Sequence, residues 1–189
     1  MHLSSCSNFT EIYGKKILGG LDWIKTHPEP IYFTVTIGDP VIRKIVAERA
    51  EELGYIPHSI IATDFRKREK VDIGVGSIFI PGVVFTNGQK IGKYCHVHEG
   101  VMVGHKITLG NYGTLAPGAV VFGGCEIGEG AYIGGNATIL QFKKVGDWSI
   151  VGAGAVVTKN VPRLTTYVGN PARKIKDFGT MGNRKKYRI

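Results

Sequence analysis

The fold is decided by a six-residue repeat that is clearest in CEIGEG AYIGGN ATILQF KKVGDW SIVGAG, residues 125–154. Every group of six has an apolar third residue, and most groups have a glycine in their second half. A period of six matches neither the 3.6-residue period of a helix nor the two-residue alternation of a hairpin. It is typical of a parallel β-helix, in which each block supplies one short strand and one corner of a coil.

The same phase holds outward from this stretch over fifteen blocks, residues 71–160. The third residue of each block is apolar: Ile73, Phe79, Phe85, Ile91, Val97, Val103, Leu109, Leu115, Val121, Ile127, Ile133, Ile139, Val145, Val151 and Val157. The first residue is mostly small or β-branched. Because side chains alternate along a strand, first and third residues are expected to point into the column and the second residue outward. With three blocks to a coil, we expect five coils in a prism roughly 20 Å tall, with residues eighteen apart stacked above one another.

A small α/β domain is predicted before the repeat, over residues 1–65. The run IYFTVTI, residues 31–37, is rich in strand-forming residues and ends at Gly38. Asp39 and Pro40 then supply an N-cap and a first-turn proline for a helix.

This helix is predicted to run to about Leu53 and to be closed by Gly54. Its apolar face is expected to consist of Val41, Ile42, Ile45, Val46, Ala50 and Leu53. A short strand near residues 59–62 completes a strand–helix–strand unit. The charged residues 64–70 are expected to be a solvated linker to the repeat.

Residues 161–189 are expected to form a C-terminal loop and a basic tail. The segment TYVGNPARK, residues 166–174, is placed to cap the open end of the column. The tail, residues 179–189, is expected to be mobile in an isolated chain or docked on a neighbouring subunit.

Lysine and arginine outnumber the acidic residues 24 to 15, which gives a formal net charge of +9. This excess favours an anionic ligand, such as a phosphorylated cofactor or a nucleotide sugar. It is spread along the chain without a nucleic-acid-binding motif, so no nucleic-acid partner is expected. Three cysteines give no disulfide framework, and Cys95 and Cys125 are expected in the core. With no signal peptide and no long apolar run, a cytoplasmic protein without membrane insertion is expected.

His105 is the candidate general base. It falls in the corner of VMVGHK, residues 101–106, where an exposed imidazole can take a proton from an amine or a hydroxyl. Gly123 lies one coil above it and Asn87 one coil below. The backbone N–H of Gly123 is placed to hold an oxyanion, so the group points to acyl transfer. A single exposed histidine is also compatible with an ordinary surface position.

The run HVHE, residues 96–99, raises the alternative of a metal site, because alternate residues of a strand face the same way. However, His96 is expected to face outward and His98 to begin a corner, and no third ligand has a suitable spacing. We therefore expect no metal.

Several stretches carry a resemblance to a known family: HEGVMVGHKITLG (98–110), GGCEIGEGAYIGGNATI (123–139), SIVGAGAVVTKNVP (149–162), YVGNPARK (167–174) and IGDPVIRKIV (37–46). On these residues the chain resembles the hexapeptide-repeat sugar acyltransferases, which include nucleotide-amino-sugar N-acetyltransferases and sialic acid O-acetyltransferases. The resemblance implies a mainly β fold, a left-handed parallel β-helix preceded by a small α/β domain.

The resemblance also implies a homotrimer that binds acetyl-CoA, as co-substrate, in the groove between two neighbouring prisms. The histidine at the place of His105 is the general base in that family, and the amide at the place of Gly123 holds the thioester carbonyl. Further contacts to acetyl-CoA are expected from Gly124, Gly152, Ala153, Gly154, Arg173 and Lys174, the last two at its phosphates. A small-molecule sugar acceptor is expected to contact Asn87, His98, Gly38 and Asp39. Its amine would attack directly, without an acyl-enzyme.

Three positions depart from the family pattern. No first strand with a glycine-rich turn precedes Phe9, so the α/β domain is expected to be truncated. Lys106 stands where an acidic residue commonly adjoins the histidine, so a backbone carbonyl or Glu99 is expected to orient His105. Family members often have a second polar ring side chain nine residues after the histidine. This chain has Thr114 there, which predicts reduced or redirected activity.

The leading prediction is an acetyl-CoA-dependent acetyltransferase that acts on the amino group of a nucleotide-linked sugar. One alternative is a sugar O-acetyltransferase, and another is a non-catalytic CoA-binding trimeric scaffold, which the short α/β domain suggests. A zinc hydratase like the carbonic anhydrases built on the same prism is a further alternative, although its histidine spacing differs from that found here.

Overall fold

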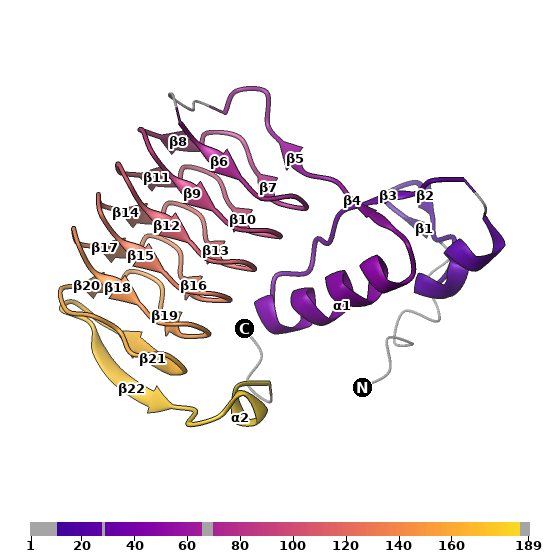
Figure 1. The fold of residues 1–189 in the computed structure, drawn as a ribbon. Coiled ribbons are helices and arrows are strands. Elements are labelled where there is room, and N and C mark those ends of the chain that lie inside the picture. Colours follow the sequence, from indigo (N-terminus) through magenta and orange to yellow (C-terminus); the bar gives the residue numbers. More distant parts are fainter. Residues whose placement is uncertain (1–10, 28, 66–69, 186–189) are drawn as a thin grey trace.

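The computed structural model describes residues 11–27, 29–65 and 70–185 (Figure 1). Most of these residues form a three-sided prism of stacked coils, as the repeat predicts. Each coil passes from the first face to the second and then to the third, and all strands that stack from coil to coil are parallel. Residues eighteen apart lie opposite one another, as His96 does with Thr114.

The first face contains β5 (Ile60–Ile61), β7 (Ile78–Phe79), β10 (His96–Val97), β13 (Thr114–Leu115), β16 (Tyr132–Ile133), β19 (Ile150–Val151), β21 (Thr165–Val168) and β22 (Arg173–Asp177). The second face contains β8 (Val84–Phe85), β11 (Met102–Val103), β14 (Val120–Val121), β17 (Thr138–Ile139) and β20 (Val156–Val157). The third face contains β6 (Asp72–Ile73), β9 (Lys90–Ile91), β12 (Thr108–Leu109), β15 (Glu126–Ile127) and β18 (Lys144–Val145). The three faces enclose one continuous apolar column.

The column buries most of the first and third residues of the blocks, as predicted; Val71 and Ile73 are partly buried, and Lys143 lies outside it. Cys95 and Cys125 lie in it as free, buried thiols, while Cys6 is outside the described residues. Phe65, packed against two ring side chains of the first coil, closes one end. The segment 166–174 lies at the other end as predicted, but its residues belong largely to the antiparallel pair β21 and β22 instead of a loop.

The N-terminal region is built from short elements. It contains β1 (Glu11–Ile12), β2 (Lys15–Lys16), the 3₁₀ helix η2 (Leu21–Thr26), β3 (Tyr32–Phe33) and β4 (Ile56–Pro57). The strand expected over 31–37 is limited to β3, which pairs in parallel with β4. The strand expected near 59–62 is present as β5, but it pairs with β7 of the prism, so the solenoid begins before residue 71.

Helix α1 (Pro40–Glu52) starts where the sequence predicts, because the Asp39 carboxylate accepts hydrogen bonds from the backbone N–H groups of Val41 and Ile42. The predicted apolar face is partly wrong. The buried residues include Arg43 and Ala47, one turn apart, whereas Ile45 is 50% exposed. The face toward the prism is therefore rotated relative to the most apolar face of the sequence.

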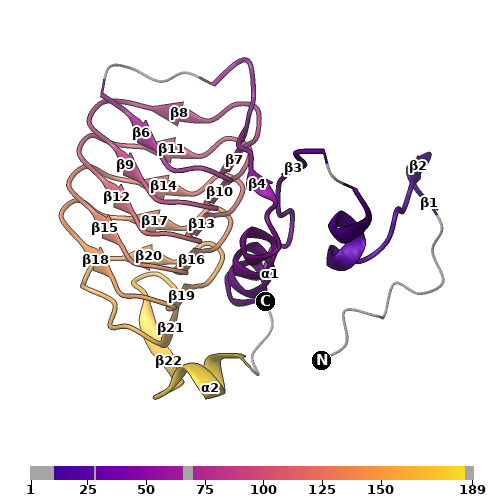
Figure 2. The same ribbon diagram turned by 45° about the vertical axis from the view of Figure 1, so that its right-hand side comes forward.

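The helix lies along the edge where the third face meets the first (Figures 1 and 2). The corners of this edge carry large side chains in the left-handed backbone region: Tyr94, Tyr112, Trp148 and Leu164. The rings of Tyr94 and Tyr112 are parallel, with centroids 5.6 Å apart. Residues with a Cβ seldom adopt this conformation, and here their burial beneath α1 supports it.

The C-terminal segment folds back onto the same chain. Helix α2 (Met181–Lys185) lies near the start of α1 (Figure 1), and Arg184 is fully buried with its Nη1 3.9 Å from the Asp39 carboxylate. For residues 179–185 the expectation of a mobile tail or one docked on a neighbour is therefore wrong, and residues 186–189 lie outside the described part. No helix in that part is both long and apolar enough to cross a bilayer.

Arg43 fastens the N-terminal region to the first face. Its guanidinium has no exposed surface. Nη1 shares its two hydrogens among three acceptors, the carbonyls of Ile37 (2.8 Å) and Gly38 (3.0 Å) and His96 Nδ1 (3.2 Å), and Nη2 donates to the carbonyl of Tyr112 (2.6 Å) and to Thr114 Oγ1 (2.7 Å), while Nε has no partner among the described residues. Two acceptors belong to the segment before α1 and three to coils of the prism. The side chain is thus a rigid link between the two parts of the chain.

His96 faces away from the column as expected, but the N-terminal region covers it, and it is 4% exposed. Because arginine can only donate, Nδ1 accepts from Arg43, and Nε2–H donates to the Val35 carbonyl at 2.8 Å. Burial, reinforced by the neighbouring positive charge, lowers the pKa of His96 to about 3. The ring is therefore neutral at physiological pH.

This pKa predicts an acid-sensitive interface. Below the ordinary histidine pKa of 6.5 the unfolded chain takes up a proton that the folded chain does not bind until about pH 3. The His96 contribution to the free energy of unfolding should therefore fall with pH across this window, by on the order of 1 kcal/mol per pH unit. Urea unfolding of wild type and His96→Asn, which keeps an acceptor for Arg43, measures it. We expect the shallower pH dependence for the variant, and parallel curves would contradict the prediction.

Candidate active site

His105 lies in the corner between β11 and β12, on the edge where the second face meets the third, and its side chain is exposed. The backbone of this corner is held from both sides. Lys106 N donates to the carbonyl of Asn87 in the coil below at 2.9 Å, and Gly124 N donates to the carbonyl of His105 at 2.9 Å. Asn87, His105, Gly123 and Gly124 are therefore brought together, as predicted from the eighteen-residue spacing.

The imidazole of His105 lies directly against the backbone of Gly123. A Cβ atom on Gly123 would stand 2.4 Å from Cε1 and 2.7 Å from Nε2 of the ring. Only glycine leaves room for the ring in this position. In the described chain no acceptor is bonded to the N–H of Gly123, although its carbonyl accepts from the amide of Phe142 at 3.0 Å. An exposed imidazole and an unpaired backbone donor, buried beneath the ring, thus share one corner.

Glu99 does not orient His105. It lies at the corner where the first face meets the second, and its carboxylate is 3.9 Å from Nδ1 of His98. The described residues offer no hydrogen-bond partner to the His105 ring, so the packing against Gly123 is its main restraint. The carboxylate that the sequence offered for this role therefore belongs to another edge of the prism.

The predicted cofactor residues divide between two edges. Gly124 adjoins His105, whereas Gly152, Ala153 and Gly154 lie where the first face meets the second. Gly152 is packed beneath Val168, where a Cβ would stand 2.7 Å from Cγ1, and the next two residues are exposed. The second face separates this group from His105. A single chain therefore does not bring the two groups together.

The predicted phosphate ligands lie on β22, at the end of the first face. Arg173 is exposed and donates to the carbonyl of Ala172 at 3.0 Å. Lys174 is exposed and forms an ion pair with Asp177 at 3.2 Å. Both cations stand at the same end of the prism as Gly152.

The residues predicted to bind the sugar also lie in separate parts of the structure. Asn87 is exposed beside His105, but His98 lies on the first face, where burial, and to a lesser extent the positive charge of Arg43, lowers its pKa. Gly38 is exposed at the start of α1, and the Asp39 carboxylate there caps the helix and faces Arg184. Arg43 anchors this segment to the first face, which lies opposite the edge that carries His105.

Apolar side chains are exposed between these groups. They form a patch on the second face and its border with the third face, called here the second-face patch: Val84, Met102, Phe122, Leu140 and Phe142. Phe142 is 67% exposed, and its ring lies where a Cβ on Gly124 would fall. Contiguous exposed apolar residues of this kind mark an interaction surface.

The described residues contain no group of three histidine, cysteine, aspartate or glutamate side chains that could hold a metal ion. His96 is occupied on both nitrogens, and the ring centroids of His96 and His98 are 6.2 Å apart. Arg43 could not be singled out from the sequence, because an arginine within a helix normally faces the solvated side. Its one signal is its place at the border of the predicted apolar face, on the same side of the helix as Ala50, two turns later.

The comparisons with known proteins agree with this architecture. Residues 124–159 match the family described as bacterial transferase hexapeptide (six repeats). The chain is 34% identical over 159 residues to the GDP-perosamine N-acetyltransferase of Escherichia coli O157:H7, which covers 84% of this chain and 64% of that protein. The chain therefore spans a little less than two thirds of the length of this relative.

Two solved structures are similar over most of the chain. WeeI from Acinetobacter baumannii AYE has a TM-score of 0.84 and 36% identity, with 88% of this chain and 81% of that chain covered. PerB from Caulobacter crescentus, solved in complex with CoA and GDP-perosamine, has a TM-score of 0.84 and 26% identity, with 88% and 82% covered. With its repeat, its prism and these relatives, the chain belongs to the hexapeptide-repeat family of bacterial transferases.

Proposed function

We propose that this chain transfers the acetyl group of acetyl-CoA to the amino group of a nucleotide-linked sugar, with His105 as the general base. The observation that carries the proposal is the imidazole of His105 packed on Gly123, whose N–H has no acceptor in the described chain. The similarity to a GDP-perosamine N-acetyltransferase and to PerB, solved with CoA and GDP-perosamine, supports this choice of donor and acceptor.

In this mechanism His105 accepts a proton from the sugar amine while the amine nitrogen bonds to the thioester carbonyl carbon. The N–H of Gly123 stabilises the oxyanion that forms on the carbonyl oxygen. As the carbon–sulfur bond breaks, the protonated His105 returns its proton to the departing thiolate. The products are an amide and a free thiol, and no acyl-enzyme forms.

A homotrimer would complete this site. On one chain, His105 and the three residues Gly152–Gly154 lie on different edges of the prism, and Gly38 is fixed over the face opposite His105. A neighbouring copy that covers the second-face patch would bring its own edge against His105. Arg173 and Lys174 are then proposed to bind the phosphates of acetyl-CoA, with Lys174 exchanging Asp177 for a phosphate oxygen.

The first prediction from the proposed function concerns His105. With acetyl-CoA and a panel of GDP-, UDP- and dTDP-linked amino sugars, the wild type should release free thiol in the presence of at least one acceptor. His105→Ala should lower kcat by about 10² to 10⁴-fold, the usual contribution of a general base, because the amine loses the group proposed to accept its proton. Equal thiol release by the two proteins would remove His105 from the mechanism. Binding of CoA without turnover on any acceptor would support the non-catalytic scaffold instead.

The second prediction concerns Gly123. Gly123→Ala should lower kcat on the order of 10²-fold, because the new Cβ displaces the His105 ring and disturbs the oxyanion donor. The melting temperature should change little, since the displaced group is the end of an exposed side chain. In a His105→Ala background the same change should cost far less activity. Equal losses in both backgrounds would show that the ring contact is unimportant.

The third prediction concerns assembly. Met102→Glu, at the centre of the second-face patch, should convert the trimer to monomer and abolish turnover, because a carboxylate would be buried at the contact. Thr108→Glu is the matched control, since it places the same charge at the outward position of the next strand on the third face. Light scattering after size-exclusion chromatography measures both proteins. A monomeric wild type, or an active monomeric Met102→Glu, would contradict the shared site.

A further inference from the structure

We infer that Arg43 is a positioning residue for the acceptor: it fixes the loop that binds the nucleotide sugar relative to the prism. The inference rests on the proposed function. It concerns a side chain that contacts neither the sugar nor acetyl-CoA in that proposal and acts through the loop of Ile37 and Gly38.

The position of this loop makes it the part of the N-terminal region suited to an acceptor. It follows β3, which runs parallel to β4, and in open parallel sheets ligands bind beyond the carboxyl ends of the strands. Gly38 is exposed, and no neighbouring atom lies within 4 Å of the place a Cβ would occupy. An acceptor can therefore approach the loop from solvent, while the carbonyl groups of Ile37 and Gly38 are turned inward to Arg43.

The guanidinium of Arg43 holds this loop from the side that faces the prism. Nη1 donates to the loop carbonyls at 2.8 and 3.0 Å, and Nη2 donates to the carbonyl of Tyr112 at 2.6 Å and to Thr114 Oγ1 at 2.7 Å. Because the guanidinium is planar and its donors point in fixed directions, these bonds define the distance and the angle between the loop and one coil of the stack, at Tyr112 and Thr114. A lysine cannot hold both sides at once.

The burial of Arg43 argues that this geometry has a use beyond stability. Its side chain is fully buried, and within the described residues no carboxylate forms an ion pair with it. All five of its bonded acceptors are uncharged, and the charge of the nearby Asp39 carboxylate offsets only part of the cost of removing the guanidinium from water. An apolar side chain could fill the same space and hold α1 to the prism. What it could not do is bind the two loop carbonyls and two coils simultaneously.

A positioning role for Arg43 predicts different effects on the binding of the two substrates. Acetyl-CoA is proposed to bind along the edges of the prism, and those residues do not touch Arg43. Loss of the Arg43 hydrogen bonds should therefore weaken binding of the acceptor and leave binding of acetyl-CoA unchanged. A purely structural role would lower the melting temperature and the amount of folded protein, but would not discriminate between the substrates.

The test uses Thr114→Val, which removes the Oγ1 acceptor at nearly constant volume and leaves Arg43 in place. We expect the KM for the nucleotide sugar to rise about tenfold, the usual effect of one lost hydrogen bond to a charged group, with the KM for acetyl-CoA essentially unchanged. Thr114→Ser, which keeps the hydroxyl, should restore the acceptor KM. Arg43→Lys should show the larger rise if it folds.

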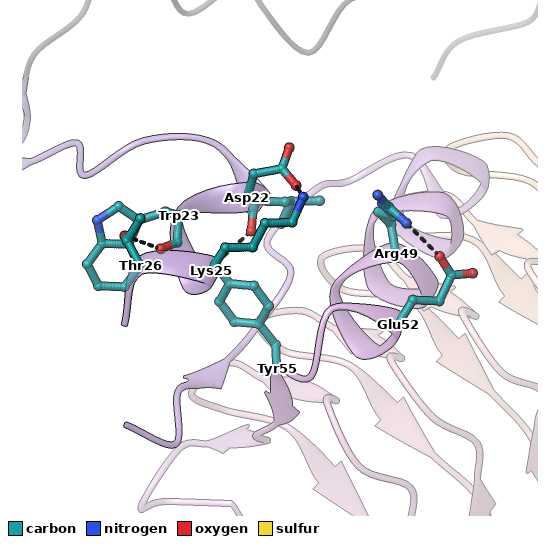
Figure 3. Close-up of polar contacts among 8 residues, drawn as sticks. Asp22, Trp23, Lys25, Thr26, Arg49, Glu52 and Tyr55 are labelled. Carbon is teal, nitrogen blue, oxygen red and sulfur yellow. Dashed lines mark hydrogen bonds and ion pairs between the residues drawn. The ribbon is translucent and has the colours of Figure 1, made fainter. Parts of the chain in front are cut away.

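Arg49→Lys is the matched control on the same helix. Arg49 is exposed and pairs with Glu52 at 3.1 Å on the outer side of α1, as Figure 3 shows. The Arg49→Lys variant should leave the KM for the nucleotide sugar and the KM for acetyl-CoA unchanged. Hydrogen exchange of the segment 31–39 gives a second readout, and it should be faster in Thr114→Val than in wild type or Arg49→Lys.

The outcomes are distinguishable. Unchanged acceptor KM in Thr114→Val, or an equal rise in both KM values, overturns the positioning role and leaves the proposed function intact. A rise that Thr114→Ser does not restore also overturns it, since the hydroxyl would not be responsible. A wild type that acetylates no nucleotide sugar overturns the proposed function itself, and the inference with it.

Discussion

The stacking of parallel coils, with an offset of eighteen residues between neighbours, is the constraint on which the rest of this structure depends. Backbone hydrogen bonds run from each coil to the next, so every corner stands over another corner. The residue type that fits at a position therefore depends on the stacked residue in the next coil as much as on its own strand. Gly123 shows this clearly, because a Cβ there would stand 2.4 Å from the ring of His105 in the coil below. The candidate active site is therefore a property of two coils together.

The same stacking shapes the opposite side of the prism. At the edge between the third and first faces, Tyr94, Tyr112 and Trp148 adopt left-handed backbone conformations that would be unfavourable in an isolated coil. Helix α1 covers them, and together they form one apolar cluster. Apolar packing of this kind is non-directional, so it holds the helix without setting its orientation sharply. The directional bonds of Arg43 supply what the packing lacks.

The parts of this architecture that repeat locally could be predicted from the sequence, and the parts that depend on one unique contact could not. The six-residue phase predicted the column and the stacking of His105 beneath Gly123, and the Asp39–Pro40 capping signal predicted the start of α1. It could not show that Arg43 faces the prism, because helix periodicity places apolar residues inward and here a buried cation takes that place. Nor could it show the cover over His96, the pairing of β5 with β7, or the buried Arg184, since each depends on how distant segments dock. Glu99 was misassigned for a related reason: closeness in sequence placed it near His105, whereas three faces distribute neighbouring blocks over different edges.

The division of the site between edges has a geometric cause. In a three-sided prism each edge is separated from the others by a full face, so one chain presents His105, its small-residue edge and its N-terminal loop in different directions. A monomer could unite them only by bending the stack, which the coil-to-coil hydrogen bonds oppose. A second copy, by contrast, can place a different edge against His105 without any internal change. The second-face patch lies between the two edges and offers the apolar area for such a contact, at roughly 25 cal/mol for each Å² removed from water. Rigid coils and the proposed shared site are thus two consequences of one repeat, since the regularity that fixes His105 against Gly123 also keeps the other predicted ligand residues on separate edges.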